Sequence, residues 1–290
     1  MSPVLVQHVP TSQQISIQFD RIDQTAMIGI RRAAVFLGLG VNAANDPSLN
    51  DYLLTQETSV EILPNTVSAE VLKGWKRHFR NWIVCGGFRE LVDQLCIYFD
   101  QIHYACDLVS RSHTPARKKA FERQGLDGKL TALEQHFGIA IANGPLLASF
   151  YPVRNCFAHR LGRVGPEDLQ KGPTLDLRYR RLGLVSIDAG QETPLPDLSA
   201  PGAPPVQLKA GQEIGVHFPE ERLQFRLNQM VELTPKHLTD VLLFSHFCVK
   251  AMNAEVIEFA KARGVLRVTQ TDIAKADVAV PQSQSPENAV

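Results

Sequence analysis

The chain carries no excess of charge of either sign, because its 30 lysine and arginine residues balance its 30 aspartate and glutamate residues. A protein without net positive charge has no global electrostatic attraction for nucleic acid, so contact with RNA or DNA must come from a local basic patch. This balance counts against a dedicated DNA-packaging protein. It leaves open an enzyme that acts on RNA.

Cysteine pairs and long apolar runs are also missing. The 5 cysteines form an odd number without a Cys-x-x-Cys pair, and we therefore expect reduced thiols and no disulfide framework. No stretch approaches the roughly eighteen uninterrupted apolar residues of a membrane span. The N-terminal segment lacks the basic start and apolar run of a signal peptide. We expect a cytoplasmic protein that does not contact a membrane.

Familiar catalytic signatures are absent as well, including the Gly-x-Ser-x-Gly elbow, the Walker phosphate loop and the HExxH helix. The pair Gly38-x-Gly40 lacks the strand–glycine–helix frame of a dinucleotide site. His103 and Cys106 are spaced to share a metal on one helix face, yet no second pair of that kind exists, and structural zinc needs four ligands. We therefore expect core packing for this pair, and neither a metal nor a cofactor.

Apolar residues recur at three- and four-residue steps along most of the chain, which predicts a mainly α-helical fold. Ser68 and Thr234 are the expected N-caps. Gly38 and Gly40 are expected to end the first helix, Gly162 a later one, and the pair Gly86-Gly87 is expected to interrupt the second helix. The expected helices span about 23–39, 68–106, 115–124, 129–141, 145–161 and 235–262.

Alternating apolar and polar residues predict strands in the last third of the chain, and a short strand at 15–19. The segment 42–65 is expected to be a connector, and the five prolines between Pro194 and Pro205 an exposed loop. The expected later strands are 175–180, 214–218 and 223–227. The predicted organisation is an irregular arm (1–22), a helical domain (23–264) with a small antiparallel β-insertion at about 174–231 before the last long helix, and a polar tail (265–290).

The segment from Arg154 to His159, RNCFAH, concentrates chemically capable side chains near the end of a predicted helix. An imidazole titrates near neutral pH, so His159 can exchange a proton with a ribose 2′-hydroxyl or a leaving 5′-oxygen. Arg154 can hold a phosphate through its bidentate fork and stabilise charge on a transferring phosphoryl group. Asn155 supplies neutral donors that can orient either group, whereas Cys156 is expected to pack inward.

Arg-Asn-x-x-x-His on a late helix of an α-bundle resembles the signature of HEPN-domain proteins, many of which are metal-independent endoribonucleases. The following Arg160-Leu161-Gly162 is similar to the His-Arg-x-Gly continuation of a number of them. The motif match covers six residues, and the looser helical resemblance covers most of 23–264. The resemblance implies a HEPN-like helical bundle that cleaves RNA to 2′,3′-cyclic phosphate ends without a metal. It also implies a homodimer with the active site across the interface, and is compatible with a regulatory protein partner.

Helix geometry constrains this motif. At about 100° per residue, Asn155 and His159 lie about 40° apart, whereas Arg154 and His159 differ by roughly 140°. A pair that diverges in this way does not converge on one small ligand, so two helices meeting at a shared cleft are the easier arrangement. Pro152 either aims the motif into a cleft by restarting the helix or marks a site that has drifted from the family pattern.

Further basic residues surround the motif. Arg160 and Arg163 follow it directly and Arg178 falls on the first strand of the insertion, so they are the expected contacts to an RNA backbone. The alternative for the strand arginines is a solvated sheet face. Lysines and arginines around Trp75 and Trp82 fit the charged outer face of an amphipathic helix better than a nucleic-acid surface.

Two functions therefore stay open, besides a plain helical scaffold with a chance arginine–histidine pair. The first is a metal-independent endoribonuclease that uses Arg154, Asn155 and His159. The second is a HEPN-like module that has lost catalysis and binds RNA, a nucleotide or a protein partner.

Overall fold

The structure is a computed structural model that describes residues 17–45, 51–53, 59–61, 68–170, 172–188, 190–196, 205 and 211–265. The fold is mainly α-helical with small antiparallel sheets, as the sequence predicts. In chain order the elements are α1 (Phe19–Asn45), β1 (Asp51–Leu53), β2 (Ser59–Glu61), α2 (Ala69–Val109), α3 (Pro115–Glu122), α4 (Leu126–Phe137), α5 (Gly144–Ala148), α6 (Phe150–Arg160), a 3-10 helix η1 (Pro166–Leu169), β3 (Leu175–Arg180), β4 (Gly183–Asp188), β5 (Gln191–Pro194), β6 (Glu213–His217), β7 (Glu220–Phe225) and α7 (Pro235–Lys261).

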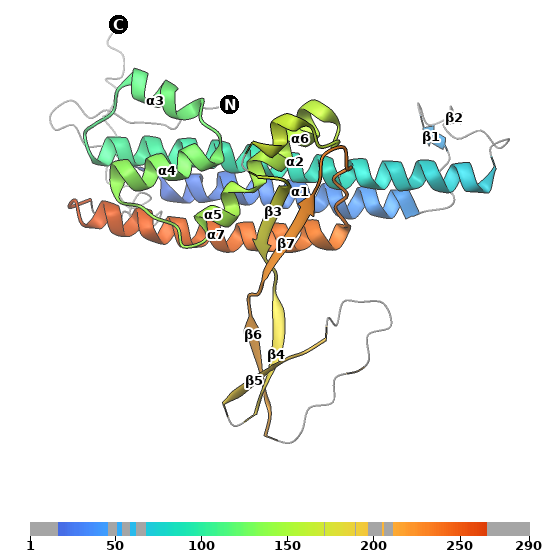
Figure 1. The fold of residues 1–290 in the computed structure, drawn as a ribbon. Coiled ribbons are helices and arrows are strands. Elements are labelled where there is room, and N and C mark those ends of the chain that lie inside the picture. The colour runs from blue at the N-terminus through green and yellow to red at the C-terminus, as the bar shows by residue number, and fades with distance from the viewer. Residues whose placement is uncertain are drawn as a thin grey trace, which may run out of the picture.

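The three longest helices, α1, α2 and α7, pack against one another and form the body of the molecule (Figure 1). Their facing side chains are apolar and buried, with Ala33 from α1, Leu91 and Leu95 from α2 and Val249 from α7 each at most 1% exposed. Burial of this kind contributes roughly 1.5–3 kcal/mol for each large apolar side chain. The shared core therefore fixes the position of α2, on which the candidate site is built.

A polar clamp joins the first and last described helices. Asp23 of α1 accepts hydrogen bonds from Lys250 and Asn253 of α7 at 2.9 and 2.7 Å. Asn253 in turn accepts one from the Tyr98 hydroxyl of α2 at 2.7 Å. One short chain of hydrogen bonds thus ties together three helices that are far apart in the sequence.

Glycines on α1 and α2 mark close helix contacts, and the expectation that they end or interrupt helices is wrong. α1 continues past residue 39 to Asn45, and α2 passes through the glycine pair at 86–87 as one helix of 41 residues. A Cβ on Gly40 would lie 2.6 Å from the Ile83 side chain, and one on Gly87 would lie 3.0 Å from Leu238. Glycine is needed at these positions because a neighbouring side chain occupies the space of its missing Cβ.

The predicted helix starts at Ser68 and Thr234 are confirmed, since each side chain accepts a hydrogen bond from the backbone N–H three residues later, in the first turn. α4 begins earlier and ends earlier than the expected 129–141, and closes at Gly138 in the left-handed conformation with φ 71°. α7 ends at Lys261, within one residue of the prediction.

The strands between α6 and α7 form a ribbon that projects from the helical body (Figure 1). β3 pairs antiparallel with β7 at its base, from Leu175 opposite Phe225 to Arg180 opposite Glu220. β4 then continues the ribbon between β5 and β6. Leu177 is fully buried at the base, whereas Val216 is 55% exposed farther out. The predicted strands at 175–180, 214–218 and 223–227 are therefore found, with β4 and β5 in addition.

Several expectations concern the less regular parts of the chain. Within the expected connector at 42–65, α1 extends to Asn45 and β1 pairs with β2. Of the expected strand at 15–19, the first two residues lie outside the described residues and Phe19 begins α1. Most of the proline-rich stretch and the tail from 266 onward also lie outside them, while Pro194 ends β5.

Among the described helices, α1 has the length and apolar composition of a possible membrane span. Helices of a packed core meet the same criterion, and this one carries Asp23 and Arg32 in contact with α7 and α2.

Candidate functional site on helix α6

Helix α6 is a separate short helix, and Pro152 explains where it begins. The helix expected over 145–161 is divided at Ser149, which follows α5 and caps α6. Pro152 occupies the first turn of α6, where a backbone N–H has no carbonyl of the same helix to bind. The Ser149 hydroxyl donates to the Leu146 carbonyl and accepts from the Arg178 backbone N–H of β3 at 2.9 Å. Pro152 thus restarts the helix, and Ser149 fixes its origin to the sheet.

One face of α6 is packed against α2. Phe150, Val153 and Phe157 follow the three- and four-residue spacing of a buried face, and each is at most 4% exposed. The ring of Phe88 on α2 lies 5.6 Å from that of Phe150 and 5.9 Å from that of Phe157. Because His159 is two residues beyond Phe157, about 200° around the helix, its side chain lies on the opposite face and is exposed.

Cys156 belongs to the buried face, as predicted. Its thiol is fully buried, and desolvation raises its pKa to about 12. A thiol with so high a pKa is protonated at neutral pH and is a poor nucleophile. The chemistry of the motif therefore rests on its polar side chains.

Arg154 is held at the edge of the α6–α2 contact by a carboxylate that the sequence analysis did not single out. Its Nε donates to Asp93 Oδ1 of α2 at 2.8 Å, and its Nη1 donates to Asn155 Oδ1 at 3.1 Å. Desolvation would lower the pKa of Arg154, but the hydrogen bond and charge of Asp93 outweigh it and raise that pKa. The guanidinium is a permanent cation, and three of its five N–H donors remain for a ligand.

The structure joins Arg154 to Asn155 but not to His159. The helix is regular through both positions, so the angular separation of roughly 140° expected from the sequence applies. Among the described residues, no hydrogen bond or ion pair to the His159 side chain is present. Within one chain, the Arg154 guanidinium and the His159 imidazole thus lie on different parts of the surface.

The end of α6 is shaped by two consecutive left-handed residues and an arginine–carboxylate pair. Leu161 has φ 52° and Gly162 has φ 85°, and both backbone N–H groups bond to the Cys156 carbonyl. Arg160, predicted to bind RNA, donates to both carboxylate oxygens of Asp168, whose side chain is only 2% exposed. This pair fixes η1 beside the motif, so Arg160 has a structural partner.

Arg178 and Arg163, the other two predicted RNA contacts, differ in whether a carboxylate neutralises their charge. Arg178 on β3 is paired with Glu220 of β7, with Nε and Nη2 each 2.8 Å from one carboxylate oxygen. Arg163 is exposed and donates from Nη1 to the backbone carbonyl of Asn228, which carries no full charge. Of these three arginines, Arg163 therefore offers the least neutralised positive charge, and it stands four residues after His159.

No protein-family model, curated protein or solved structure matches this chain.

A second polar cluster, which the sequence analysis did not assemble, lies where α2 ends. Asp107 is fully buried, and its carboxylate is 3.0 Å from Arg117 Nε, 3.5 Å from His103 Nδ1 and 4.0 Å from His113 Nδ1. The His103 ring stacks on Phe121 with ring centroids 3.9 Å apart. His103 and Cys106 are both buried, as expected for core packing, and no metal-binding group of three or more ligands exists among the described residues.

Sequence reasoning missed Asp93 and Asp107 for the same reason. Each is an acid on a long helix, and nothing local marks it as the partner of an arginine elsewhere in the chain. Asp93 precedes Arg154 by 61 residues, and Asp107 meets Arg117 only because the chain turns after α2. The available signal was the position of Asp107 within an apolar helix face, where an acid needs a buried partner.

Proposed function

We propose that this protein is a cytoplasmic, metal-independent endoribonuclease of the HEPN type, with its active centre on α6. The single observation that carries the proposal is the surface of α6. There, Asp93 and Asn155 hold the Arg154 guanidinium while His159, four residues beyond Asn155, is exposed to solvent. A fixed cation stabilises charge on a transferring phosphoryl group, an accessible imidazole exchanges protons, and an amide orients either group, so together they suit phosphodiester transfer in RNA.

In the proposed reaction, the ribose 2′-oxygen attacks the adjacent phosphorus while the bond from phosphorus to the leaving 5′-oxygen breaks. His159 takes the proton of the 2′-hydroxyl or delivers a proton to the 5′-oxygen, with water or a second imidazole completing the balance. Arg154 stabilises the additional charge on the non-bridging phosphate oxygens. The products are a 2′,3′-cyclic phosphate and a free 5′-hydroxyl.

A homodimer belongs to this proposal. Because Arg154 and His159 diverge on one helix, two α6 helices side by side supply the imidazole of one copy next to the guanidinium of the other. Arg163 is the favoured contact to the RNA backbone, since Arg160 and Arg178 are each neutralised by a carboxylate. A regulatory protein that covers α6 would silence both copies.

The second candidate is a HEPN-like binding module without catalysis. It is favoured by one observation, namely that Arg154 is already paired with Asp93 and does not approach His159 within the chain. In that case, the remaining guanidinium donors and Arg163 bind an RNA or another phosphate-bearing partner without turnover.

The test is cleavage of RNA by the purified protein in EDTA, with identification of the product ends. We expect 2′,3′-cyclic ends, and a loss of rate of about 100-fold or more in both His159→Ala and Arg154→Ala. His78→Ala and Arg77→Ala are the matched controls, because both residues are exposed on the first half of α2, before the stretch 88–93 that contacts α6. Both controls should cleave at the wild-type rate.

Cleavage that persists in His159→Ala, or that requires a divalent cation, would contradict the ribonuclease proposal. If no RNA is cleaved but Arg154→Ala weakens RNA binding relative to Arg77→Ala, the binding module is the correct function. RNA methylated at every 2′-hydroxyl serves as a substrate control, since it lacks the attacking group.

A further inference from the structure

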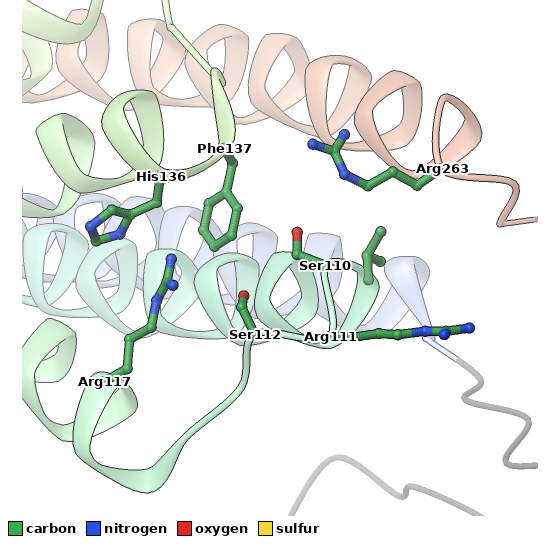
Figure 2. Close-up of a pocket in the computed structure, with 8 residues that line it drawn as sticks. Ser110, Arg111, Ser112, Arg117, His136, Phe137 and Arg263 are labelled. Atoms are coloured by element: carbon green, nitrogen blue, oxygen red, sulfur yellow. The ribbon is translucent and has the colours of Figure 1, made fainter.

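A pocket of about 550 Å³ lies at one end of the helical body, away from α6 (Figure 2). It is bounded by the loop after α2, by α3, by the end of α4 and by the residues that follow α7. Its volume falls within the range of about 300–1,000 Å³ typical of small-molecule sites. The side chains that matter for its chemistry are Arg111, Arg117, Arg263, His136, Ser110 and Ser112.

The charge of this pocket is positive. Three arginines come from three separate parts of the chain, and none of the described lining residues is acidic. Asp107 is fully buried beside this lining, and its carboxylate is shared between Arg117, the Ser112 hydroxyl and two histidines. The lining therefore carries three guanidinium groups, of which Arg117 is paired with this carboxylate.

Two of these guanidinium groups are held in fixed orientations. Arg117 is anchored by Asp107 at 3.0 Å and lies over the Phe137 ring, with its Cζ 5.3 Å from the ring centroid. Arg263 lies over the Phe259 ring at 3.7 Å and donates from Nη1 to the Phe259 carbonyl. In Figure 2 the Arg263 side chain extends over Ser110, the Arg117 guanidinium lies beside His136, and the Phe137 ring lies between the two arginines. Stacking orders an arginine before any ligand arrives, which lowers the entropic cost of binding.

The third arginine has an unusual backbone. Arg111 has φ 53°, a left-handed conformation that costs a residue with a Cβ roughly 1 kcal/mol. The tight turn directs the chain from α2 into α3 and leaves the Arg111 side chain exposed at the rim (Figure 2). It makes no hydrogen bond or ion pair with another described side chain.

Cations near helix C-termini also stabilise the helix dipoles, and α2, α4 and α7 all end here. That role accounts for Arg263, which bonds to a terminal carbonyl of α7. It does not account for Arg117, which comes from α3, or for the concentration of hydroxyl groups and a histidine around one open volume.

We propose that this pocket binds a small molecule with a diphosphate or polyphosphate group, placed between Arg117 and Arg263 with Arg111 closing over it. Arginine is suited to bidentate phosphate recognition. The Ser110 hydroxyl supplies a neutral donor, whereas the Ser112 hydroxyl already donates to Asp107. Two separated guanidinium groups and the pocket volume fit linked phosphoryl groups better than a single orthophosphate. The proposal is independent of the ribonuclease activity, because no residue of α6 lines the pocket.

Calorimetric titration of the full-length protein with inorganic pyrophosphate tests this proposal, with orthophosphate and sulfate as comparison anions. We expect saturable pyrophosphate binding that Arg263→Met weakens at least tenfold, and clearly weaker binding of the two comparison anions. Arg89→Met removes an exposed arginine of α2 with the same change of charge and should leave the affinity unchanged. Arg111→Glu is the second variant, because an exposed rim residue can be replaced without disturbing the core.

The absence of saturable binding would overturn the proposal. So would equal affinities in the Arg263→Met, Arg111→Glu and Arg89→Met proteins, since the anion would then bind elsewhere. Orthophosphate or sulfate binding as tight as pyrophosphate binding would overturn the assignment to linked phosphoryl groups.

Discussion

The two halves of α2 follow the same sequence pattern but have different surroundings. From Ile83 onward, the apolar face is covered by α1, α4, α6 and α7, and residues such as Phe88 and Leu91 are fully buried. In the first half, α1 is the helix that packs beside α2, and Trp75 and Trp82 are 44% and 62% exposed. The Trp82 ring contacts Phe36 of α1 and Phe79, both of which are also exposed.

The contrast shows that forming a helix with an apolar face and covering that face are separate matters, and that an apolar repeat in the sequence reports only the first. A three- and four-residue spacing determines that a segment forms a helix with an apolar face. Whether that face is covered depends on elements that come from elsewhere in the chain. The interpretation of the first half as an ordinary amphipathic helix is therefore incomplete, because its aromatic face is exposed together with its charged face.

The largest expected effect is on the free energy of unfolding when one aromatic residue is removed from each half. We predict that Phe88→Ala destabilises the protein by about 3–5 kcal/mol, because it empties a site between Phe150 and Phe157. Trp82→Ala should change the stability by less than about 1 kcal/mol. Urea unfolding followed by far-UV circular dichroism measures both, and similar losses would show that the exposed half is covered in solution.

A smaller change in the free energy of unfolding is expected when the pH is lowered. Within α2, it arises from His103 in the buried second half. Burial lowers the pKa of His103 from 6.5 to about 4, although the charge of Asp107 acts in the opposite direction. Between these values the unfolded chain binds a proton that the folded chain does not, so stability is complete above about pH 6.5 and decreases as the pH falls toward 4. The loss is on the order of 2–3 kcal/mol.

Unfolding of the wild type and His103→Phe across this pH range measures that contribution, since phenylalanine retains the stacking on Phe121. His237 titrates in the same sense, because burial lowers its pKa as well, so the variant should flatten the profile without abolishing its slope. Identical profiles for the wild type and His103→Phe would contradict the assignment.

The smallest expected effects on stability come from two glycines of α1, one packed against α2 and one facing open space. A Cβ on Gly29 would lie 2.3 Å from Gln94 Cβ, whereas one on Gly38 meets nothing within 4 Å. We predict that Gly29→Ala destabilises by about 1–3 kcal/mol through overpacking. Gly38→Ala should stabilise by up to about 1 kcal/mol through helix propensity. Shifts of the urea midpoint in the same direction for both variants would contradict the packing described for α1 and α2.

Much of the fold is predictable because it is determined locally. Ser68 and Thr234 act as caps through side chains that reach their own first turn, and the strands at 175–180 and 223–227 alternate as an antiparallel pair must. The glycine errors have a common cause. Gly40 and Gly87 lie against neighbouring helices, and sequence spacing gives no measure of how closely two helices approach.

The candidate site is predictable only in part, for a related reason. The residue types in the motif indicate its chemistry, and the helix period gives the 140° divergence of Arg154 and His159. The pairing of Arg154 with Asp93, and of Arg160 with Asp168, depends on where α2 and η1 lie in space. The pocket lined by Arg117 and Arg263 is even harder to predict from the sequence. Its two arginines are 146 residues apart and line one pocket only after α7 has packed.

The clamp between α1 and α7 has a consequence for how the protein is made. Asp23 contacts residues that are 227 and 230 positions later in the chain, and Tyr98 contacts one that is 155 positions later. During translation, α1 and α2 leave the ribosome long before α7 is synthesised, so the part of their apolar surface that α7 covers stays open in the interval. Contacts of such high sequence separation form late and slow the final step of folding. The nascent chain therefore passes through a stage in which α1 and α2 lack α7, and the apolar surface exposed at that stage is available to a chaperone.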